Sequence, residues 1–124
     1  MNREILFRGK RDGDGEWVMG DRAGYSDYVM IWDLIDKGVG YLVDHTTVGQ
    51  FTGLCDKNGV KIFEGDVVFA GYGEYYQGTH EHSTTIIIDM ADYEALNALC
   101  NANVVEVIGN IHDTPAFGLK GEAE

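Results

Sequence analysis

Two histidines separated by one residue, His80 and His82, are the side chains best suited to metal binding. In an extended chain both point to the same side, and two imidazoles can share a zinc ion. A catalytic zinc site needs a third protein ligand and a structural site a fourth, so Asp89, His112 or His45 would have to be supplied by the fold. The pair is a candidate metal site, with two solvated histidines as the alternative, and no cofactor is predicted.

Nucleophiles and catalytic motifs are scarce in this sequence. Cys55 and Cys100 are far apart in the sequence and are expected to be reduced thiols that behave as small apolar side chains. The chain has no Gly-x-Ser-x-Gly elbow, no Walker loop and no Gly-x-Gly-x-x-Gly before a helix. Paired carboxylates carry little information among 21 Asp and Glu residues. We therefore expect a protein that is not an enzyme.

Charge is distributed unevenly along the chain. The 124 residues include 9 Lys and Arg against 21 Asp and Glu, a formal net charge of −12. Four of the basic residues lie within the first eleven positions: Arg3, Arg8, Lys10 and Arg11. No Lys or Arg lies between Lys61 and Lys120. Acidic surfaces repel phosphates, so nucleic acid is a disfavoured partner. Two alternatives remain open, a nucleic-acid-binding barrel that uses the basic N-terminal strand and an acidic mimic of DNA.

Short runs of β-branched and aromatic residues, separated by glycine-rich turns, dominate the sequence. The 17 glycines and the single proline are typical of tight turns in a small β-domain. A helix over 27–36 competes with a strand, since Ser26 could cap it and Gly38 could end it, but the strand is favoured. Trp17 and Trp32 lie inside strand runs and are expected in the core. Strands are expected at 28–32, 40–43, 67–69, 85–88 and 105–111, and hairpins over 3–19 and 51–63.

One helix is expected, over residues 91–100. Tyr93, Leu96, Leu99 and Cys100 recur at helical spacing and would share one face. Asp89 or Asp92 can cap its N-terminus. Because the helix is short, packing on the sheet must hold it in place.

The segment 71–84 is expected to be a long, exposed and mobile loop. It has no clear periodicity, and loops of this length are often functional. Three tyrosines in it combine an apolar ring with a polar tip, which is typical of interface anchors: Tyr72, Tyr75 and Tyr76. They are the predicted contacts for a protein partner, with rings that close one end of a barrel as the alternative.

Turn-forming residues are concentrated between residues 44 and 68. Asn58-Gly59 separates two apolar runs and tolerates the positive φ of a primed hairpin turn, and Glu64-Gly65-Asp66 is a second tight turn. Side chains of this kind can bond to the backbone, so the pattern is predicted to be structural. The structural set is Gly49, Gly53, Asn58, Gly59, Gly65 and Asp66.

The run DHTTVGQFTGLCDKNGVKIFEGDVV, residues 44–68, resembles the signature of the YopX family, small proteins encoded by bacteriophages and prophages. The resemblance continues in an opening strand at 3–8 and a closing strand at 107–115, whereas the segment 71–103 matches no part of the pattern. His112 stands where the family often has an aromatic residue. The resemblance implies an SH3-type β-barrel and no catalytic residues.

These observations predict one β-domain over residues 1–117 and a flexible tail over 118–124. No apolar run approaches the ~20 residues of a membrane helix, and no export signal is seen, so the cytoplasm of a bacterial host is the expected location. The expected role is a phage- or prophage-encoded protein-interaction module whose partner comes from the phage or the host. Self-association is also expected, because open barrels leave strand edges and Ile86-Ile87-Ile88 is apolar on both faces.

Overall fold

The computed structural model describes residues 5–76 and 79–113, and for 74–76 and 79–81 the backbone alone. The described chain is mainly β, with 52% strand and one α-helix, and its strands form two antiparallel sheets. It divides into two compact units, unit 1 (Met1–Gly53) and unit 2 (Leu54–Glu124). No closed barrel is found among the described residues, so the SH3-type barrel stays a prediction. The predicted tail at 118–124 lies outside the described residues.

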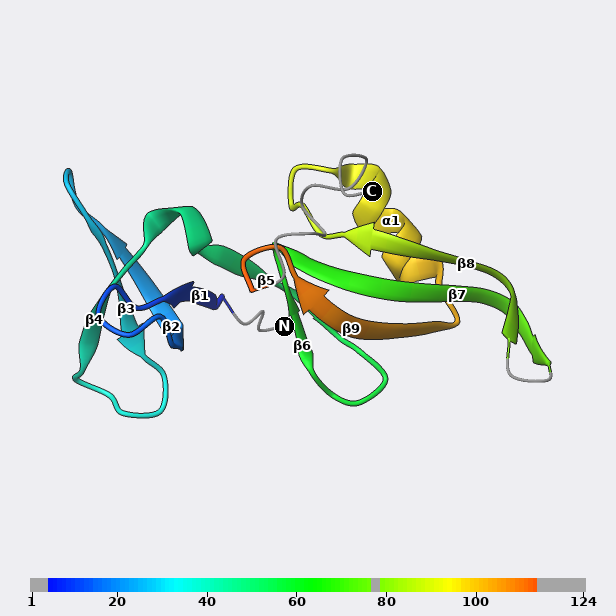
Figure 1. Ribbon diagram of the computed structural model, residues 1–124, viewed down its shortest axis with the longest axis horizontal. Helices are drawn as coiled ribbons and strands as arrows, with labels where there is room; N and C mark the ends of the chain where they lie inside the picture. Colours follow the sequence, from blue (N-terminus) through cyan, green and yellow to red (C-terminus); the bar gives the residue numbers. More distant parts are fainter. Residues whose placement is uncertain (1–4, 77–78, 114–124) are drawn as a thin grey trace. The chain divides into compact units, whose positions relative to one another are not determined.

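Unit 1 contains the strands β4-β3-β2-β1-β5 of one curled sheet of six strands, in which β6 (Lys61–Phe63) follows β5 (Figure 1). The hairpin expected over 3–19 and the strands expected at 28–32 and 40–43 are confirmed, and the competing helix over 27–36 is wrong. The elements are β1 (Phe7–Lys10), β2 (Trp17–Gly24), β3 (Val29–Asp33), β4 (Gly40–Val43), the 3-10 turn η1 (His45–Thr47) and β5 (Gly49–Cys55), which ends in unit 2.

Alternation along these strands gives unit 1 one buried face. Its core consists of Val18, Val29, Ile31 and Val43, and three half-buried side chains pack around them: Phe7, Tyr41 and Val48. Ile31 is fully buried. The run thus forms a strand rather than a helix because every second residue, Val29 and Ile31, enters this core.

The curl of the sheet brings the end of β1 to β4. Arg11 forms an isolated antiparallel bridge with Val43. The N–H of Asp12 donates to the carbonyl of Leu42, and the N–H of Asp44 to the carbonyl of Lys10, both at 2.9 Å. The turn between β1 and β2 is therefore fixed beside the β3–β4 hairpin.

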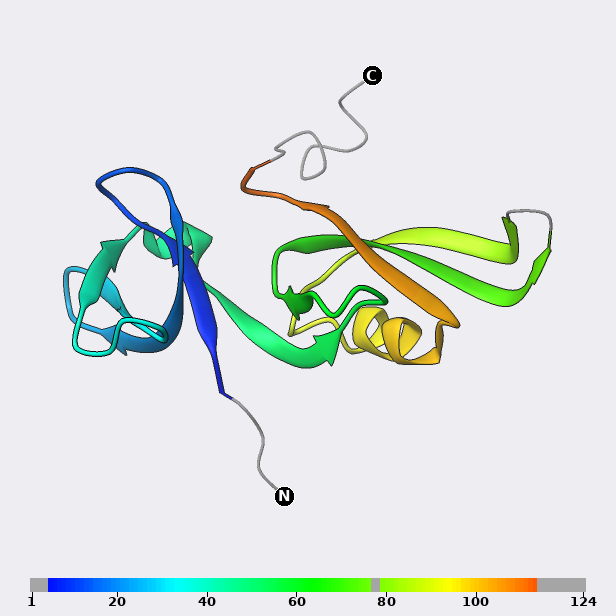
Figure 2. The ribbon, with the colours of Figure 1, turned by 90° about the horizontal axis from the view of Figure 1, so that it is seen from below.

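Unit 2 contains a three-stranded antiparallel sheet, of order β8-β7-β9, and the helix (Figure 2). Its core consists of Ile62, Val68, Ile88 and Leu99. Ile86 packs against this core, so two of the three isoleucines proposed for self-association serve the interior of unit 2. The elements are β6 (Lys61–Phe63), β7 (Asp66–Tyr76), β8 (Thr79–Ile87), α1 (Tyr93–Asn101) and β9 (Val104–Asn110).

The long loop expected at 71–84 is wrong. Residues 71–76 and 79–84 form the far halves of β7 and β8, where Tyr72 pairs with His82 and the register shifts between Tyr72 and Tyr75. Gly73 has φ of 79°, which is how the chain accommodates the irregularity. Gly71 and Gly73 belong to this bulged strand, and β9 pairs with its other side as far as Gly71.

The expected helix is confirmed. Asp92 caps it, since its carboxylate accepts from the N–H of Ala95 at 3.1 Å. The predicted apolar face is only partly correct: Leu99 is buried and Leu96 packs on the core, but Tyr93 is 80% exposed and Cys100 is exposed. Among the described residues no helix is long and apolar enough to cross a membrane.

The hairpin from β5 to β6 turns at Asp56, which is buried and organises three backbone groups. Its carboxylate accepts from the N–H groups of Asn58 (2.8 Å), Val60 (2.9 Å) and Val107 (2.9 Å). Burial raises the pKa of Asp56, but the three hydrogen bonds outweigh it, and the pKa lies below its usual value. Gly59 has φ of 82°, and a loop of three residues replaces the expected two-residue turn.

The second turn of the pattern is held by Asp66, of which 2% is exposed. Its carboxylate accepts from the N–H of Phe63 at 2.8 Å. Gly65 has φ of 95°, and Gly53, earlier in the pattern, has φ of 92°, conformations that favour glycine. Asp56 and Asp66 therefore bond to the backbone of the turns that contain them, and Asp56 also bonds to Val107 of β9.

Candidate functional site

The outward face of β3 and β4 in unit 1 is apolar. Because Val29, Ile31 and Val43 point into the core, their neighbours Met30, Trp32 and Leu42 point outward. Trp32 is 39% exposed and Leu42 is 48% exposed. An antiparallel sheet with one solvated face usually carries polar side chains there, so this face departs from the ordinary pattern.

These apolar side chains are packed around Gly40. In the strand register Met30 lies opposite Leu42, and Trp32 lies opposite Gly40. A Cβ atom on Gly40 would lie 2.8 Å from Cε3 of Trp32 and 2.9 Å from Cε of Met30. The indole thus rests against the bare backbone of β4, and Met30, Trp32 and Leu42 form one surface, called here the β3–β4 surface.

The loop between β3 and β4 adds two exposed aliphatic side chains at the end of the same hairpin. Leu34 is 42% exposed and Ile35 is 91% exposed. The carboxylate of Asp33 accepts from the N–H of Ile35 at 2.9 Å and from that of Asp36 at 3.3 Å. The N–H of Leu34 donates to the carbonyl of Met19 at 2.9 Å. The backbone that presents Ile35 to solvent is therefore fixed by hydrogen bonds.

A hollow of about 640 Å³ adjoins the β3–β4 surface, lined on one side by Met30, Gly40 and Leu42 and on the other by the turn after β1. At its edge the guanidinium of Arg11 bonds to the carboxylate of Asp14, with 3.0 Å from Nε to Oδ1. This bond lowers the pKa of Asp14 to about 2. The edge of the hollow therefore carries a fixed ion pair beside an apolar floor.

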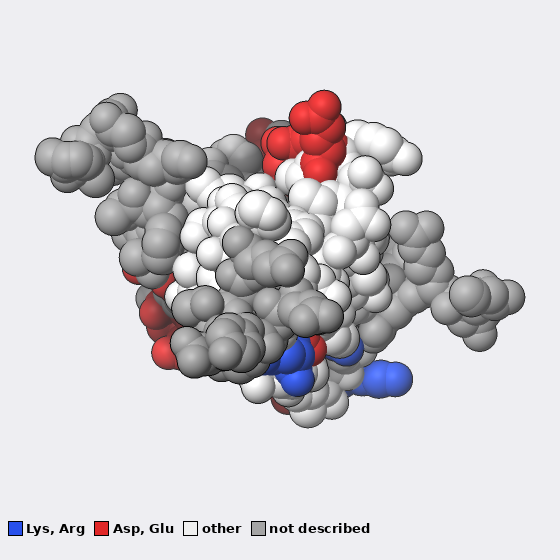
Figure 3. Space-filling view, turned by 90° about the vertical axis from the view of Figure 1, so that its right-hand side faces the viewer, with Lys and Arg blue, Asp and Glu red and all other residues white. Residues whose placement is uncertain are grey.

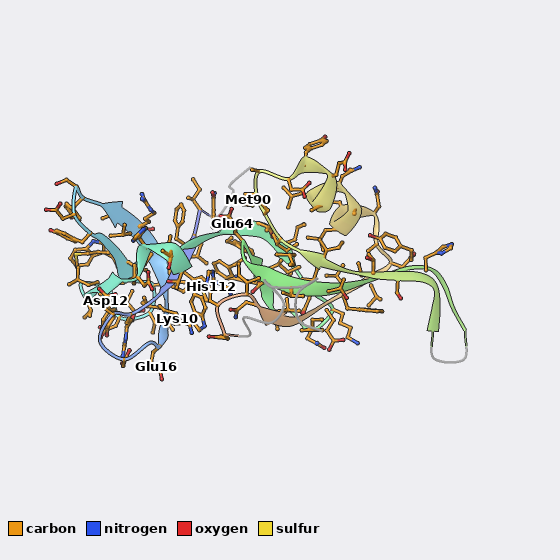
Figure 4. The ribbon with its side chains drawn as sticks, turned by 45° about the horizontal axis from the view of Figure 1, so that its top comes forward. Lys10, Asp12, Glu16, Glu64, Met90 and His112 are labelled. Atoms are coloured by element: carbon orange, nitrogen blue, oxygen red, sulfur yellow. The ribbon has the colours of Figure 1, made fainter. Side chains whose placement is uncertain are left out.

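Acidic side chains border this region. Asp12 and Asp36 are exposed in the two flanking turns, and Asp21 lies opposite Trp32 in the strand register. Within the described part of the chain none of the three carboxylates forms an ion pair. In Figure 4 Asp12 and Glu16 lie in the turn that follows Lys10. The surroundings of the β3–β4 surface thus favour a positively charged partner.

The basic residues of β1 lie with an aromatic ring on the outward face of unit 1. The guanidinium carbon of Arg8 lies 4.5 Å, and Nζ of Lys10 5.6 Å, from the centroid of Trp17. Lys10 lies opposite Trp17 in the register. Arg3, the fourth basic residue of the predicted strand, lies outside the described residues. Arg8 and Lys10 therefore share the ring of Trp17. Arg11 lies over another ring, that of Tyr41.

The predicted site residues in unit 2 are placed differently from one another. The hydroxyl of Tyr72 donates to the carbonyl of Ala98 at 2.8 Å, so this half-buried tyrosine joins β7 to α1. Tyr75 and Tyr76 lie in β7, but their side chains and that of His80 are outside the described part. His82 is exposed. No group of three metal-ligating side chains occurs among the residues described.

Charge in unit 2 is strongly acidic, with three Lys and Arg against twelve Asp and Glu, or −9, compared with −3 for unit 1. Figure 3 shows acidic side chains at the top and along the left edge of one face, with uncharged described residues between them.

Sequence reasoning missed the β3–β4 surface because it placed Trp32 in the core. The available signal was that the run Val29-Met30-Ile31-Trp32 is apolar on both faces. If one face packs on the core, the other is left as an apolar surface. The alternation alone does not say which face is covered.

One comparison with known proteins gives a match. The model of a protein family described as YopX protein matches residues 6–117. No curated protein and no solved structure matches the chain.

Proposed function

The chain belongs to the YopX family, and we propose that it is a non-enzymatic protein-interaction module encoded by a bacteriophage or prophage and active in the bacterial cytoplasm. One observation carries this proposal, the exposed apolar surface on the outward face of β3 and β4. Exposed apolar patches on a folded protein commonly mark sites where another protein binds.

Trp32 is the proposed anchor. Tryptophan is enriched among the residues that dominate binding energies, because its large ring gains most from being covered. The ring is held against Gly40 beside Met30, so little conformational freedom remains to be lost on binding. The adjoining hollow provides space for an apolar side chain of the partner.

The carboxylates around this surface favour a partner with positive charge. Asp12, Asp21 and Asp36 would be opposed by Lys or Arg residues that flank an apolar anchor. Such complementarity mainly accelerates association and weakens with salt. It also opposes self-association, because each copy carries −12, so the predicted homo-oligomer is the less supported assembly. A sedimentation mass equal to 13.7 kDa at all concentrations would exclude it.

The experiment compares two exposed aromatics. Trp32→Ser removes the anchor in unit 1, and Tyr93→Ser removes a more exposed ring on α1 of unit 2. Affinity capture from lysates of a bacterial host, with and without phage infection, identifies proteins retained by the wild type. The dissociation constant of a purified candidate is then measured for all three chains, after circular dichroism has shown that each is folded.

We expect Trp32→Ser to weaken binding about 30-fold or more, the effect of losing a binding hot spot of at least ~2 kcal/mol. Tyr93→Ser should bind like the wild type. Equal affinity of Trp32→Ser and the wild type would show that the β3–β4 surface is not the interface.

A second candidate is binding of single-stranded nucleic acid by Arg8, Lys10 and Trp17. Cations beside an aromatic ring are the elements such binding uses. An electrophoretic shift at low salt, lost in Arg8→Gln/Lys10→Gln but kept in the exposed control Arg22→Gln, would support it. Absence of a shift at about 100 µM protein, the weak end of non-specific binding, would reject it.

A further inference from the structure

The two cysteines line the same hollow in unit 2, although they are far apart in the sequence. Cys55 is the last residue of β5, and Cys100 lies in the last turn of α1. The hollow has a volume of about 310 Å³. Both residues are exposed and neither forms a disulfide. Two exposed cysteines therefore border one small space.

The other polar groups that line this hollow are already engaged. The carboxylate of Asp56 accepts three backbone N–H groups, and Oδ1 of Asn103 accepts from the N–H of Gly73 at 2.7 Å. The ammonium of Lys57 lies 3.5 Å from the carboxylate of Glu106. No histidine is among the lining residues. The two sulfur atoms are thus the donors that remain for a ligand.

The rest of the lining is apolar. Leu54, Ile62, Leu99 and Val105 form much of the wall. Two sulfur donors alone do not suit zinc, which takes four protein ligands in structural sites and three in catalytic ones. They suit soft, thiophilic centres that are satisfied by two thiolates, of which Cu(I) is the common metal example.

We propose that Cys55 and Cys100 together bind one soft centre, Cu(I) or trivalent arsenic, inside this hollow. With Cu(I), two S–Cu bonds form, the ion leaves its carrier ligand, and two protons go to solvent. With an arsenoxide, two S–As bonds form, the As=O bond is lost, and the oxygen leaves as water with both thiol protons. Neither reaction changes an oxidation state, so no oxidant or reductant is required. After the first sulfur binds, the second reacts at high effective concentration.

Binding at this site has a structural consequence. The ligand would join the end of β5 to the last turn of α1, a helix of nine residues that depends on packing. A ligand that binds only the folded state raises its stability. Occupancy should therefore raise the melting temperature of the wild type.

The test uses the full chain and two probes, Cu(I) supplied as a complex with a coloured chelator under anaerobic reducing conditions, and phenylarsine oxide. Intact-mass spectrometry gives the stoichiometry, competition with the chelator gives the Cu(I) affinity, and thermal melts give the shift. Cys55→Ser and Cys100→Ser are the test variants, and Ser83→Ala, at an exposed position of β8, is the control. We expect one centre per chain for the wild type and Ser83→Ala, and at least a tenfold weaker affinity for each cysteine variant.

A second measurement guards against misfolded variants. In the unmodified chain, bound Cu(I) or arsenic should protect both cysteines from alkylation by iodoacetamide, as read by peptide mapping. The two probes separate a metal site from a metalloid site, and either one bound through both sulfurs supports the proposal. Wild-type affinity in either cysteine variant, protection of one cysteine alone, or an adduct that contains two chains would overturn it.

Discussion

The carboxylates of the two units act over different distances. In unit 1, Asp14, Asp33 and Asp44 each accept the N–H of the residue two positions further along, in exposed hydrogen bonds. In unit 2, Asp56 accepts from Val107, 51 positions away, and Glu64 accepts from the N–H of Met90, 26 positions away, at 3.4 Å (Figure 4). Unit 1 uses its acids to shape turns, whereas unit 2 also uses them to join separate elements.

This difference indicates where polar residues support the tertiary structure. Unit 1 buries no carboxylate among its described residues, and its interior is an aliphatic cluster closed by sheet curl. Unit 2 buries Asp56 and Asp66, both within the segment that resembles the family signature. A signature rich in polar turn residues is consistent with a structural role for these positions.

The largest expected effect comes from truncating the two cores. Ile31→Ala in unit 1 and Leu99→Ala in unit 2 each remove a buried side chain, of which 0% and 3% is exposed, and should each lower the free energy of unfolding by about 2–5 kcal/mol. Amide hydrogen exchange should accelerate chiefly in β2–β4 for Ile31→Ala and in β7, α1 and β9 for Leu99→Ala. Equal acceleration everywhere would show that the two cores fold as one cooperative unit.

Close backbone packing in unit 1 predicts the next effect. A Cβ atom on Gly20 would lie 1.8 Å from the carbonyl oxygen of Trp32, so Gly20→Ala forces β2 and β3 apart and should cost about 3 kcal/mol, at the upper end of overpacking effects. Nothing lies within 4 Å of the corresponding position on Gly13, and Gly13→Ala is the control. Chemical denaturation measures the free energy of unfolding of both variants. A loss in Gly20→Ala no larger than in Gly13→Ala would contradict this packing.

Removal of the Asp56 carboxylate tests the longer-range role of acids in unit 2. Asp56→Ala leaves up to three N–H groups without their acceptor and should cost about 1–3 kcal/mol in urea unfolding at pH 7. Because the pKa of Asp56 is lower in the folded chain than its ordinary 3.8, the carboxylate stabilises the fold above pH 3.8. This contribution is lost as the pH falls through the lower, folded pKa.

The matching pH series compares the wild type with Asp56→Asn. The stability difference between them should be constant near neutral pH and shrink below about pH 3.8, where the wild-type carboxylate is protonated in the unfolded chain. A difference that grows on acidification would mean that the carboxylate does not favour the folded state.

The smallest effect is expected for the exposed ion pair of unit 1. Asp14→Asn removes the partner of Arg11 at the protein surface, where such pairs contribute little and are screened by salt. The melting temperature should be unchanged at 0.15 M salt, because water weakens the attraction between exposed charges and ordering two long side chains costs entropy. A clear loss of stability that persists in 1 M salt would show that Asp14 stabilises unit 1 more than an exposed ion pair is expected to.

Much of the secondary structure could be predicted from the sequence because it depends on neighbouring residues. The strands from 28 to 43, the hairpin with Asn58-Gly59 and the helix capped by Asp92 are confirmed where local patterns were strong. The segment 71–84 was mistaken for a loop because its glycines hid the alternation of two paired strands. Most of its described pairing is between β7 and β8, with Tyr72 opposite His82, and Gly71 also pairs with Val104 of β9.

The candidate site was predicted less well. Tyr72 is of a residue type common among interface anchors, yet its hydroxyl donates to the carbonyl of Ala98 in α1. Trp32 had the composition of a core residue, yet it is exposed on the β3–β4 surface. Both tyrosine and tryptophan are amphipathic enough for either setting, so their type alone does not distinguish a partner from the chain's own interior.

The sequence by itself determined the family, the β-rich composition, the turns at Asp56–Gly59 and Glu64–Asp66 and the capped helix, since these depend on residue type and short-range geometry. The tertiary structure decided which face of β3 and β4 is left uncovered and that Cys55 and Cys100 share one hollow. The reason is physical. Strand alternation defines two faces, but which of them is buried depends on elements that the chain brings together only when it folds.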